Sequence, residues 1–295
     1  MGALVEINTD GLAKLAETIS FALGGTARGE RKMADAKAYA AELEAKTNNK
    51  IALIKAQGED AFANYVAAKE SRKLRNTVAV IEKAQSHFSE GEKVSDEPVD
   101  EGWKNRFFNI VEEISDDELR EIWGRVLAGE IKKPKSYSLR TLETLRNLTK
   151  EEAAIIVKAA SFTINNECVY KNAPLSLSDK LLLQEIDLML DDGLGLEYQW
   201  KVNGKTQFNI VLDDNFLFKL HNDSENIVDC NTEVYKLSTA GKEIFRLITI
   251  NKESRESFYK TLASHFKTKG ISHVSKHIII STIPQIRYLT EGEEI

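Results

Sequence analysis

The sequence predicts a mainly α-helical protein with a C-terminal α+β part, made of long N-terminal helices, a central small helical bundle and a mixed C-terminal domain. Three observations lead to this prediction. Residues 27–88 are rich in Ala, Lys, Glu and Gln without proline, residues 103–163 show dense helical periodicity, and strand-like runs with turn signals follow residue 165.

A chain of 295 residues is about twice the commonest domain size, so more than one compact unit is expected. The net charge of −6 argues against a surface built throughout to bind phosphate, although a local basic face is compatible with it. We divide the chain into an amphipathic segment (1–27), a long helix or helical hairpin (28–90), an acidic linker (91–102), a helical bundle (103–165) and an α/β domain (166–295).

The N-terminal segment has one apolar helical face that ends at Gly24-Gly25. A short helix with a single apolar stripe needs a partner surface, which can be the rest of the chain, another subunit or a lipid interface. We assign this face to self-association or membrane contact through Leu12, Leu15, Ile19 and Leu23.

Residues 27–88 predict a long exposed helix, or a helical hairpin broken near Thr47-Asn48-Asn49. Its apolar residues thin into a narrow stripe, which is typical of a helix that packs on one neighbour and which favours self-association. The same region carries a basic cluster that is either a solvated face or a contact for phosphate or anionic lipid: Lys69, Arg72, Lys73 and Arg75.

The acidic, turn-rich stretch 91–102 contains Pro98 and predicts a linker or surface loop at a domain boundary. Two packed helices are expected after it, with Ser115 and Glu118 forming a capping box between them and Gly129 ending the second. A further helix starts at Ser138, and Thr149 with Glu152 predicts another capping box.

Beyond residue 165, a helix over 180–190 precedes two strand-like runs that flank Asn203-Gly204, a dipeptide that strongly indicates a type I′ hairpin. Strands over 216–220 and 233–237, helices over 239–248 and 256–267, and a strand over 274–281 complete the domain.

This order of elements, followed by the stretch YKLSTAGKEIFRLI, resembles the winged-helix domains of bacterial regulators. Such domains place a basic helix in the major groove of DNA. The corresponding helix here has Lys180 as its only basic residue and carries four carboxylates, so we do not favour it as a reader of duplex DNA.

No catalytic, cofactor-binding or metal-binding motif is present. Gly24-Gly25-Thr26 is not followed by the Lys of a phosphate loop, and the two cysteines, Cys168 and Cys230, predict buried thiols. His273 and His277 share one side of a predicted strand but lack the spacing of a metal site. We therefore predict a protein that is not an enzyme, with no cofactor, no metal and no identified small-molecule substrate.

The stretch WKNRFFNIVEEISDDELREIWGRVLAGEIKKPKSYSLRTLETLRNLTKEEA, residues 103–153, resembles an uncharacterised bacterial family with WxxRFF, ELWGRILAGEI and SLRTLE motifs, similar in layout to abortive-infection proteins of phage defence. The matching residues are Trp103, Arg106, Phe107, Phe108, Trp123, Gly124, Arg125, Leu127, Ala128, Gly129, Glu130, Ser138, Leu139, Arg140, Thr141 and Leu142. Most predict core packing or close helix approach. The residues we single out as a partner site are Arg106, Trp123, Arg125, Glu130 and Arg140, where the arginines form either structural ion pairs or an anion or partner site.

These observations favour a non-enzymatic bacterial protein that self-associates, as a homo-oligomer or with a second protein of the same system, in phage defence or stress response. A nucleic-acid-binding regulator is the alternative, and a membrane-perturbing effector acting through residues 1–27 is the second. No signal peptide or membrane span is predicted, so we expect a cytoplasmic protein, with peripheral contact to the inner membrane still allowed.

Overall fold

The computed structural model describes residues 14–15, 17–18, 36–56, 60–89, 92, 94–190, 196–281, 287–289 and 291–295. The chain divides into two compact units, residues 1–146 and 147–295. The division does not fall in the acidic stretch 91–102 or at residue 165, where the sequence predicted boundaries. None of the helices in the described ranges is long and apolar enough to cross a membrane.

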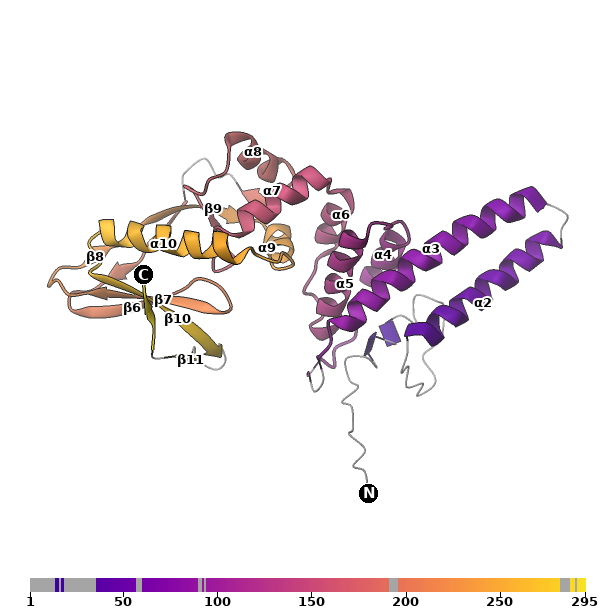
Figure 1. The fold of residues 1–295 in the computed structure, drawn as a ribbon, viewed down its shortest axis with the longest axis horizontal. Helices are drawn as coiled ribbons and strands as arrows, with labels where there is room; N and C mark the ends of the chain where they lie inside the picture. Colours follow the sequence, from indigo (N-terminus) through magenta and orange to yellow (C-terminus); the bar gives the residue numbers. More distant parts are fainter. Residues whose placement is uncertain are drawn as a thin grey trace, which may run out of the picture. The chain divides into compact units, whose positions relative to one another are not determined.

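After the short described fragment at residues 14–15 and 17–18, the first unit continues with an α-helical hairpin (Figure 1). Its helices are α2 (Ala36–Lys55) and α3 (Asp60–Ser86), which lie side by side. The predicted break at Thr47-Asn48-Asn49 is wrong, because α2 runs through these residues. Thr and Asn each cost only a few tenths of a kcal/mol more than good helix formers, and packing against α3 offsets that cost.

Three further helices follow in the described part of the first unit, and α5 packs against the C-terminal half of α3. They are α4 (Glu101–Val111), α5 (Asp117–Lys132) and α6 (Leu139–Asn147). The core contains stacked Trp103 and Phe107, with Trp123 meeting Phe107 edge to face. Gly124 allows α5 to approach α3 closely, as expected: a Cβ there would lie 2.6 Å from Lys83 Cβ.

Of the two predicted alternatives for the acidic stretch, a linker or a surface loop, its described residues before α4 form a loop within this unit. Glu92 pairs with Lys132 of α5 at 2.8 Å, and Ser95 N–H donates to the Lys132 carbonyl at 3.0 Å. Val99 is buried, and Asp100 caps α4 by accepting from Trp103 N–H at 2.8 Å.

Two local predictions about α5 are wrong: the identity of its capping residue and the role of Gly129. Asp116, not Ser115, caps α5, because its carboxylate accepts from the N–H groups of Glu118 and Leu119. Gly129 does not end the helix, which continues to Lys132. A Cβ at Gly129 would lie 2.7 Å from the Tyr137 ring, so this glycine makes room for an aromatic side chain.

The second unit starts with α7 (Lys150–Ala160), which opens with the predicted capping box of Thr149 and Glu152. The helix contacts α8 (Leu177–Glu185) and α9 (Thr239–Phe245) and so belongs here, not to the preceding bundle. An antiparallel sheet orders β1-β2-β9-β3, with β4 also on β9; the strands are β1 (Thr163–Ile164), β2 (Cys168–Tyr170), β3 (Met189–Leu190), β4 (Leu196–Tyr198) and β9 (Thr232–Leu237). Residues 186–190 were predicted to be helical, but the helix ends at Glu185, residues 186–188 form a turn, and only Met189–Leu190 form β3.

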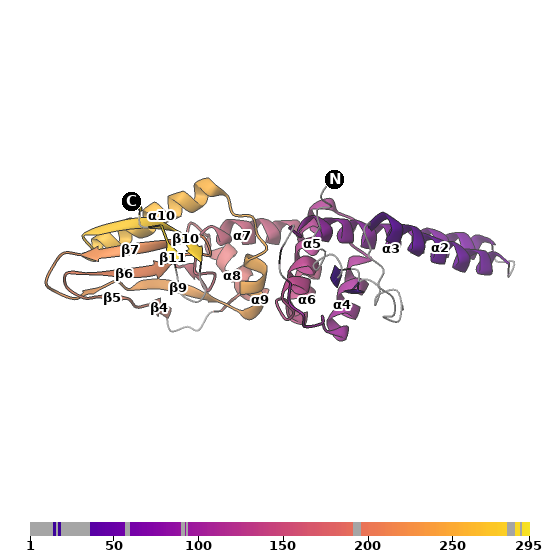
Figure 2. The same ribbon diagram turned by 90° about the horizontal axis from the view of Figure 1, so that it is seen from below.

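A second antiparallel sheet orders β11-β10-β7-β6, with β12 also on β10. Its strands are β6 (Thr206–Val211), β7 (Phe216–Asn222), β10 (His273–Ser281), β11 (Arg287–Tyr288) and β12 (Glu293–Glu294). Helix α10 (Lys252–Thr268) lies along the sheets in both views (Figures 1 and 2). Phe258, Leu262 and Phe266 of this helix join Phe218 and Leu220 in one core cluster.

The hairpin predicted at Asn203-Gly204 does not form. The strand before it, β5 (Lys201–Val202), pairs with β8 (Val228–Asp229), whereas β6 pairs with β7. Buried Asn222 donates its side-chain amide to the carbonyls of Val202 and Asn203. Gly204 is required for close approach, since a Cβ there would lie 2.2 Å from the Glu225 carbonyl oxygen.

Candidate functional site

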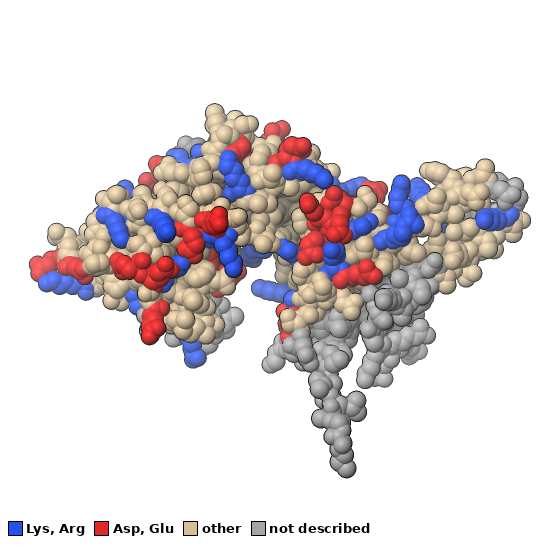
Figure 3. All heavy atoms as spheres, in the orientation of Figure 1, with Lys and Arg blue, Asp and Glu red and all other residues tan. Residues whose placement is uncertain are grey.

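The end of the α2–α3 hairpin exposes large apolar side chains. The exposed fractions of Leu53, Phe62 and Tyr65 are 69%, 56% and 63%. Ala63, which follows Phe62 in the sequence, is fully buried. On the face seen in Figure 3, the described residues at this end of the hairpin are mostly uncharged. We call Leu53, Phe62 and Tyr65 the apolar hairpin end.

The basic cluster of α3 separates into two environments. Lys73 pairs with Glu112, which caps the C-terminus of α4, and this hydrogen bond raises the Lys73 pKa above its ordinary value. Lys69, Arg72 and Arg75 are exposed. Within the described ranges, no acidic side chain pairs with any of these three cations.

A buried polar contact marks the point where α3 enters the bundle. Asn76 is 2% exposed, donates its amide to the Glu112 carbonyl at 2.8 Å, and accepts from the Arg120 guanidinium at 2.9 Å. Sequence reasoning did not identify Asn76. Its only signal is a polar residue one turn before the apolar positions Val80, Ile81 and Ala84, all buried.

The signature arginines Arg106 and Arg125 form ion pairs within the first unit. Arg106 contacts Glu143 of α6 at 2.7 Å, and Arg125 contacts Glu121 one turn earlier on α5 at 3.3 Å. Trp123 is 1% exposed and belongs to the core. Arg140 is exposed in the first turn of α6. The structure does not gather these residues into one site.

Glu130 is 1% exposed and organises the turn after α5. Its carboxylate accepts from the Lys135 N–H at 2.6 Å and from the Tyr137 N–H at 3.0 Å. The turn needs this support because Lys135 has a positive φ of 70°. The Trp103 indole donates to the Tyr137 carbonyl at 2.8 Å, so Trp103, Gly129 and Glu130 all hold one turn.

The predicted N-terminal face is described only in part. Leu15 is 4% exposed, and Lys14 donates to the carbonyls of Ser95 and Glu97. Leu12, Ile19 and Leu23 lie outside the described residues. The described residues of this segment therefore pack against the rest of the first unit.

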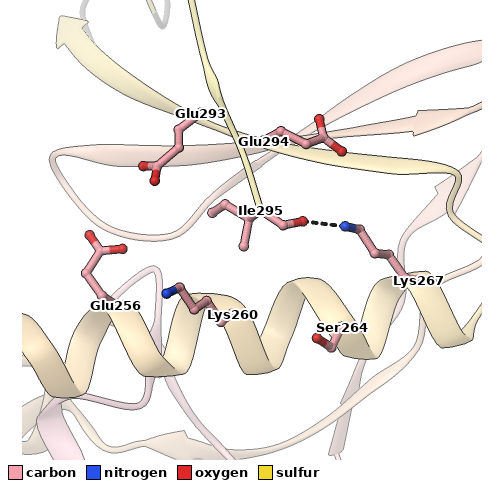
Figure 4. A pocket seen from close by; sticks show the side chains of 7 residues that line it. All are labelled: Glu256, Lys260, Ser264, Lys267, Glu293, Glu294 and Ile295. Carbon is pink, nitrogen blue, oxygen red and sulfur yellow. Dashed lines mark hydrogen bonds between the residues drawn. The ribbon is translucent and has the colours of Figure 1, made fainter.

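A cleft of about 410 Å³ lies between α10 and the segment 293–295 (Figure 4). Lys267 donates to the Ile295 carbonyl, and Glu256 and Glu293 both pair with Lys276. Lys260 and Ser264 complete the wall contributed by α10. Because the cleft mixes both signs of charge and most of them are paired, it selects no ligand chemistry.

A hydrogen-bonded chain of side chains occupies one face of β10. The His277 Nδ1 lies 2.8 Å from the Leu289 carbonyl, and its Nε2 lies 2.9 Å from Ser275 Oγ. A carbonyl only accepts, so Nδ1 carries the proton and Ser275 donates to Nε2. No group in the described ranges has the arrangement of a metal site. The predicted buried thiols, Cys168 and Cys230, are indeed buried, and burial raises the pKa of Cys230 to about 11.

Comparison with known proteins identifies one similarity. Residues 62–172, less than half of the chain, match the model of a family described as a protein of unknown function (DUF2806). No curated protein and no solved structure matches the chain. The match extends from α3 to just beyond β2, so it includes the basic cluster, the turn held by Glu130 and the signature stretch predicted from the sequence.

Proposed function

We propose that this chain is a non-enzymatic assembly protein that self-associates through the apolar hairpin end. The observation that supports the proposal is the contrast within α3. Its C-terminal half buries Val80, Ile81 and Ala84 against the bundle, whereas its N-terminal half leaves Phe62 and Tyr65 more than half exposed.

A second copy of the chain is the proposed partner. Fully burying a Leu or Phe side chain contributes about 1.5–3 kcal/mol, and a two-fold interface counts each contact twice. Paired hairpins would cover Leu53 and Phe62 of both copies without opening either fold. Exposed apolar side chains also occur elsewhere, for example Leu177 on α8, which is 73% exposed, so a matched control is available.

The test is the oligomeric state of the full chain at micromolar concentration, measured by light scattering after size exclusion. The proposal predicts an oligomer that the double variant Leu53→Glu/Phe62→Glu converts to monomer, while Leu177→Glu leaves it intact. A strictly monomeric parent protein, or equal loss of assembly in the control, would contradict it. Circular dichroism checks that each variant retains its helix content.

The biological setting we propose is bacterial phage defence in the cytoplasm, alone or with a second protein of the same system. Its support is the resemblance of residues 103–153 to a family whose layout is similar to that of abortive-infection proteins. Expression in a susceptible bacterium should lower plaque formation at least tenfold. The monomeric double variant should lose this protection, and unchanged plaque counts with the parent protein would contradict the defence role.

In this proposal the second unit performs recognition, as a winged-helix-like domain. Two observations support this role. Helix α7 contacts α8, and the strands β2, β9 and β3 are antiparallel neighbours in one sheet. Together these elements follow the helix–strand order of winged-helix domains. The absent Asn203-Gly204 ribbon removes the wing that the sequence suggested. A solution structure of a complex with the partner would identify the elements that make contact.

A further inference from the structure

An exposed track of cations runs along one stretch of α3, outside the contacts that hold the hairpin together. Lys69, Arg72 and Arg75 recur every three residues and span about 9 Å of helix axis. Figure 3 shows basic side chains gathered over the middle of this helix. We call these three residues the basic track.

Among the described residues, no nearby carboxylate pairs with the track. Glu70 faces Lys50 of α2 at 3.7 Å, and Glu112 is engaged by Lys73 and does not approach the other three cations. The protein as a whole is acidic, with a net charge of −6, so three adjacent cations that have no acidic partner in the described part of the chain need a separate explanation. Their positive field is complementary to a polyanion.

The spacing of the track fits a phosphate chain. In a strand whose bases are stacked as in a duplex, phosphates recur about every 3.4 Å along the axis, so 9 Å covers roughly three phosphates. Arginine guanidinium groups bind phosphate with two parallel hydrogen bonds, and two of the three cations are arginines.

An aromatic ring continues the same line. Tyr65 precedes Lys69 by four residues, so it lies one helical turn away on the same side, and its side chain is 63% exposed. Proteins that bind single strands combine a cationic groove with exposed rings on which bases stack, and a duplex keeps the faces of its bases covered. The arrangement therefore favours a single strand.

We propose that the basic track and Tyr65 bind single-stranded nucleic acid, the cations contacting successive phosphates and the ring stacking on a base. Tyr65 also belongs to the apolar hairpin end, so a strand and a second copy of the chain would compete for this ring. The monomeric Leu53→Glu/Phe62→Glu variant keeps Tyr65 and the basic track, and it therefore tests binding apart from self-association.

The experiment measures fluorescence anisotropy of labelled oligo-dT and oligo-rU of twenty nucleotides with the full chain. Three phosphate contacts predict that affinity falls roughly 20-fold between 50 and 200 mM salt. The triple variant Lys69→Glu/Arg72→Glu/Arg75→Glu should weaken binding at least tenfold and flatten this dependence. The control Lys236→Glu/Lys252→Glu/Lys260→Glu changes the net charge equally and should bind like the parent protein.

Tyr65→Ala separates a nucleic acid from other polyanions. It should weaken oligonucleotide binding about 5- to 100-fold and leave binding of a heparin fragment unchanged. The proposal is overturned by affinities that do not vary with salt, by equal losses in both triple variants, or by a Tyr65→Ala variant that binds oligonucleotides as tightly as the parent protein. The monomeric hairpin variant should keep the salt dependence per chain, so failure of assembly and failure of binding give different results.

Discussion

Glu130 is a carboxylate placed inside the first unit to satisfy two backbone N–H groups, those of Lys135 and Tyr137. We expect Glu130→Ala to lower the free energy of unfolding by about 2–4 kcal/mol, because two backbone N–H groups lose their acceptor. Glu130→Gln should cost less, since one amide oxygen remains. Urea unfolding measures both, with exposed Glu151→Ala as control. A change under 0.5 kcal/mol, roughly that of a surface substitution, would show that the turn does not need the carboxylate.

His277 gives a second prediction at the scale of a residue. Its Nδ1 faces the Leu289 carbonyl, so the neutral ring should be protonated at Nδ1 and accept from Ser275 at Nε2. Nitrogen-15 NMR of the labelled ring distinguishes the two tautomers. Exposed His273, which lies 3.4 Å from both Asp223 and Glu294, serves as an internal comparison. Observation of the Nε2–H form of His277 would contradict the hydrogen-bond assignment.

Arg255 shows what sequence reasoning cannot find at this scale. Its guanidinium contacts the Asp213 carboxylate at 2.8 Å and the carbonyls of Ser161 and Thr163, and Tyr259 also donates to Asp213. Asp213 lies 42 positions from Arg255 in the sequence, and Thr163 and Ser161 lie 92 and 94 positions from it. No local sequence pattern indicates contacts between segments so far apart. An arginine in an amphipathic helix is ordinarily predicted to lie on the surface.

At the scale of elements, sequence reasoning succeeded where the signal is local. The capping box of Thr149 and Glu152, the strands near 216–220 and 233–237 and the close approach at Gly124 were all predicted, because backbone propensity and side-chain spacing determine them. Sequence reasoning failed where a segment distant in the sequence determines the strand pairing. Asn203-Gly204 favours a two-residue hairpin on its own, yet β5 is held by β8 and the Asn222 amide.

The candidate surfaces divide in the same way. The basic cluster could be identified from the sequence, but the separation of Lys73 from its neighbours depends on Glu112, which reaches it only in the folded unit. The apolar hairpin end could not be distinguished from core positions, because Phe62 and Val80 both follow helical spacing. Only packing shows which of them remains in solvent.

Gly124 allows a test of the α3–α5 contact. Replacing a glycine by alanine inside a helix usually stabilises a protein by roughly 0.5–1 kcal/mol. Here the added Cβ would lie 2.6 Å from Lys83 Cβ and 2.9 Å from Ala84 N, so the helices must separate. We expect Gly124→Ala to destabilise the first unit by about 1–3 kcal/mol in urea unfolding. The sign of the change in unfolding free energy is the test, because a stabilised variant would mean that α3 and α5 are not this close.

The start of α8 gives a prediction about pH. Lys158 and the Ser176 cap lower the Asp179 pKa below its ordinary value of 3.8. A carboxyl group whose folded-state pKa is depressed stabilises the fold above its ordinary pKa, and this contribution is lost as pH falls through the folded-state pKa. Asp179→Asn should therefore destabilise the second unit at pH 7, and the difference from the parent protein should shrink towards pH 3. A difference that does not vary with pH would exclude this linkage.

For the whole molecule, the distribution of charge matters more than its sum. A net charge of −6 disfavours nonspecific adhesion to nucleic acid, so a local track of three cations can act only on a strand that reaches α3 directly. The hairpin therefore carries both proposed activities, assembly at its apolar end and anion contact along α3, while the signature residues Trp103, Gly129 and Glu130 maintain the bundle on which it rests.

The two compact units each have a separate core, centred on Trp123 in residues 1–146 and on Phe258 in residues 147–295. We expect calorimetry of the full chain to resolve two transitions, because each core can melt without unpacking the other. Gly124→Ala should lower only one midpoint. Arg255→Ala leaves the Asp213 carboxylate without its buried cation and should lower only the other, by about 3–5 kcal/mol of unfolding free energy. A single transition that both variants shift equally would mean that the units fold as one.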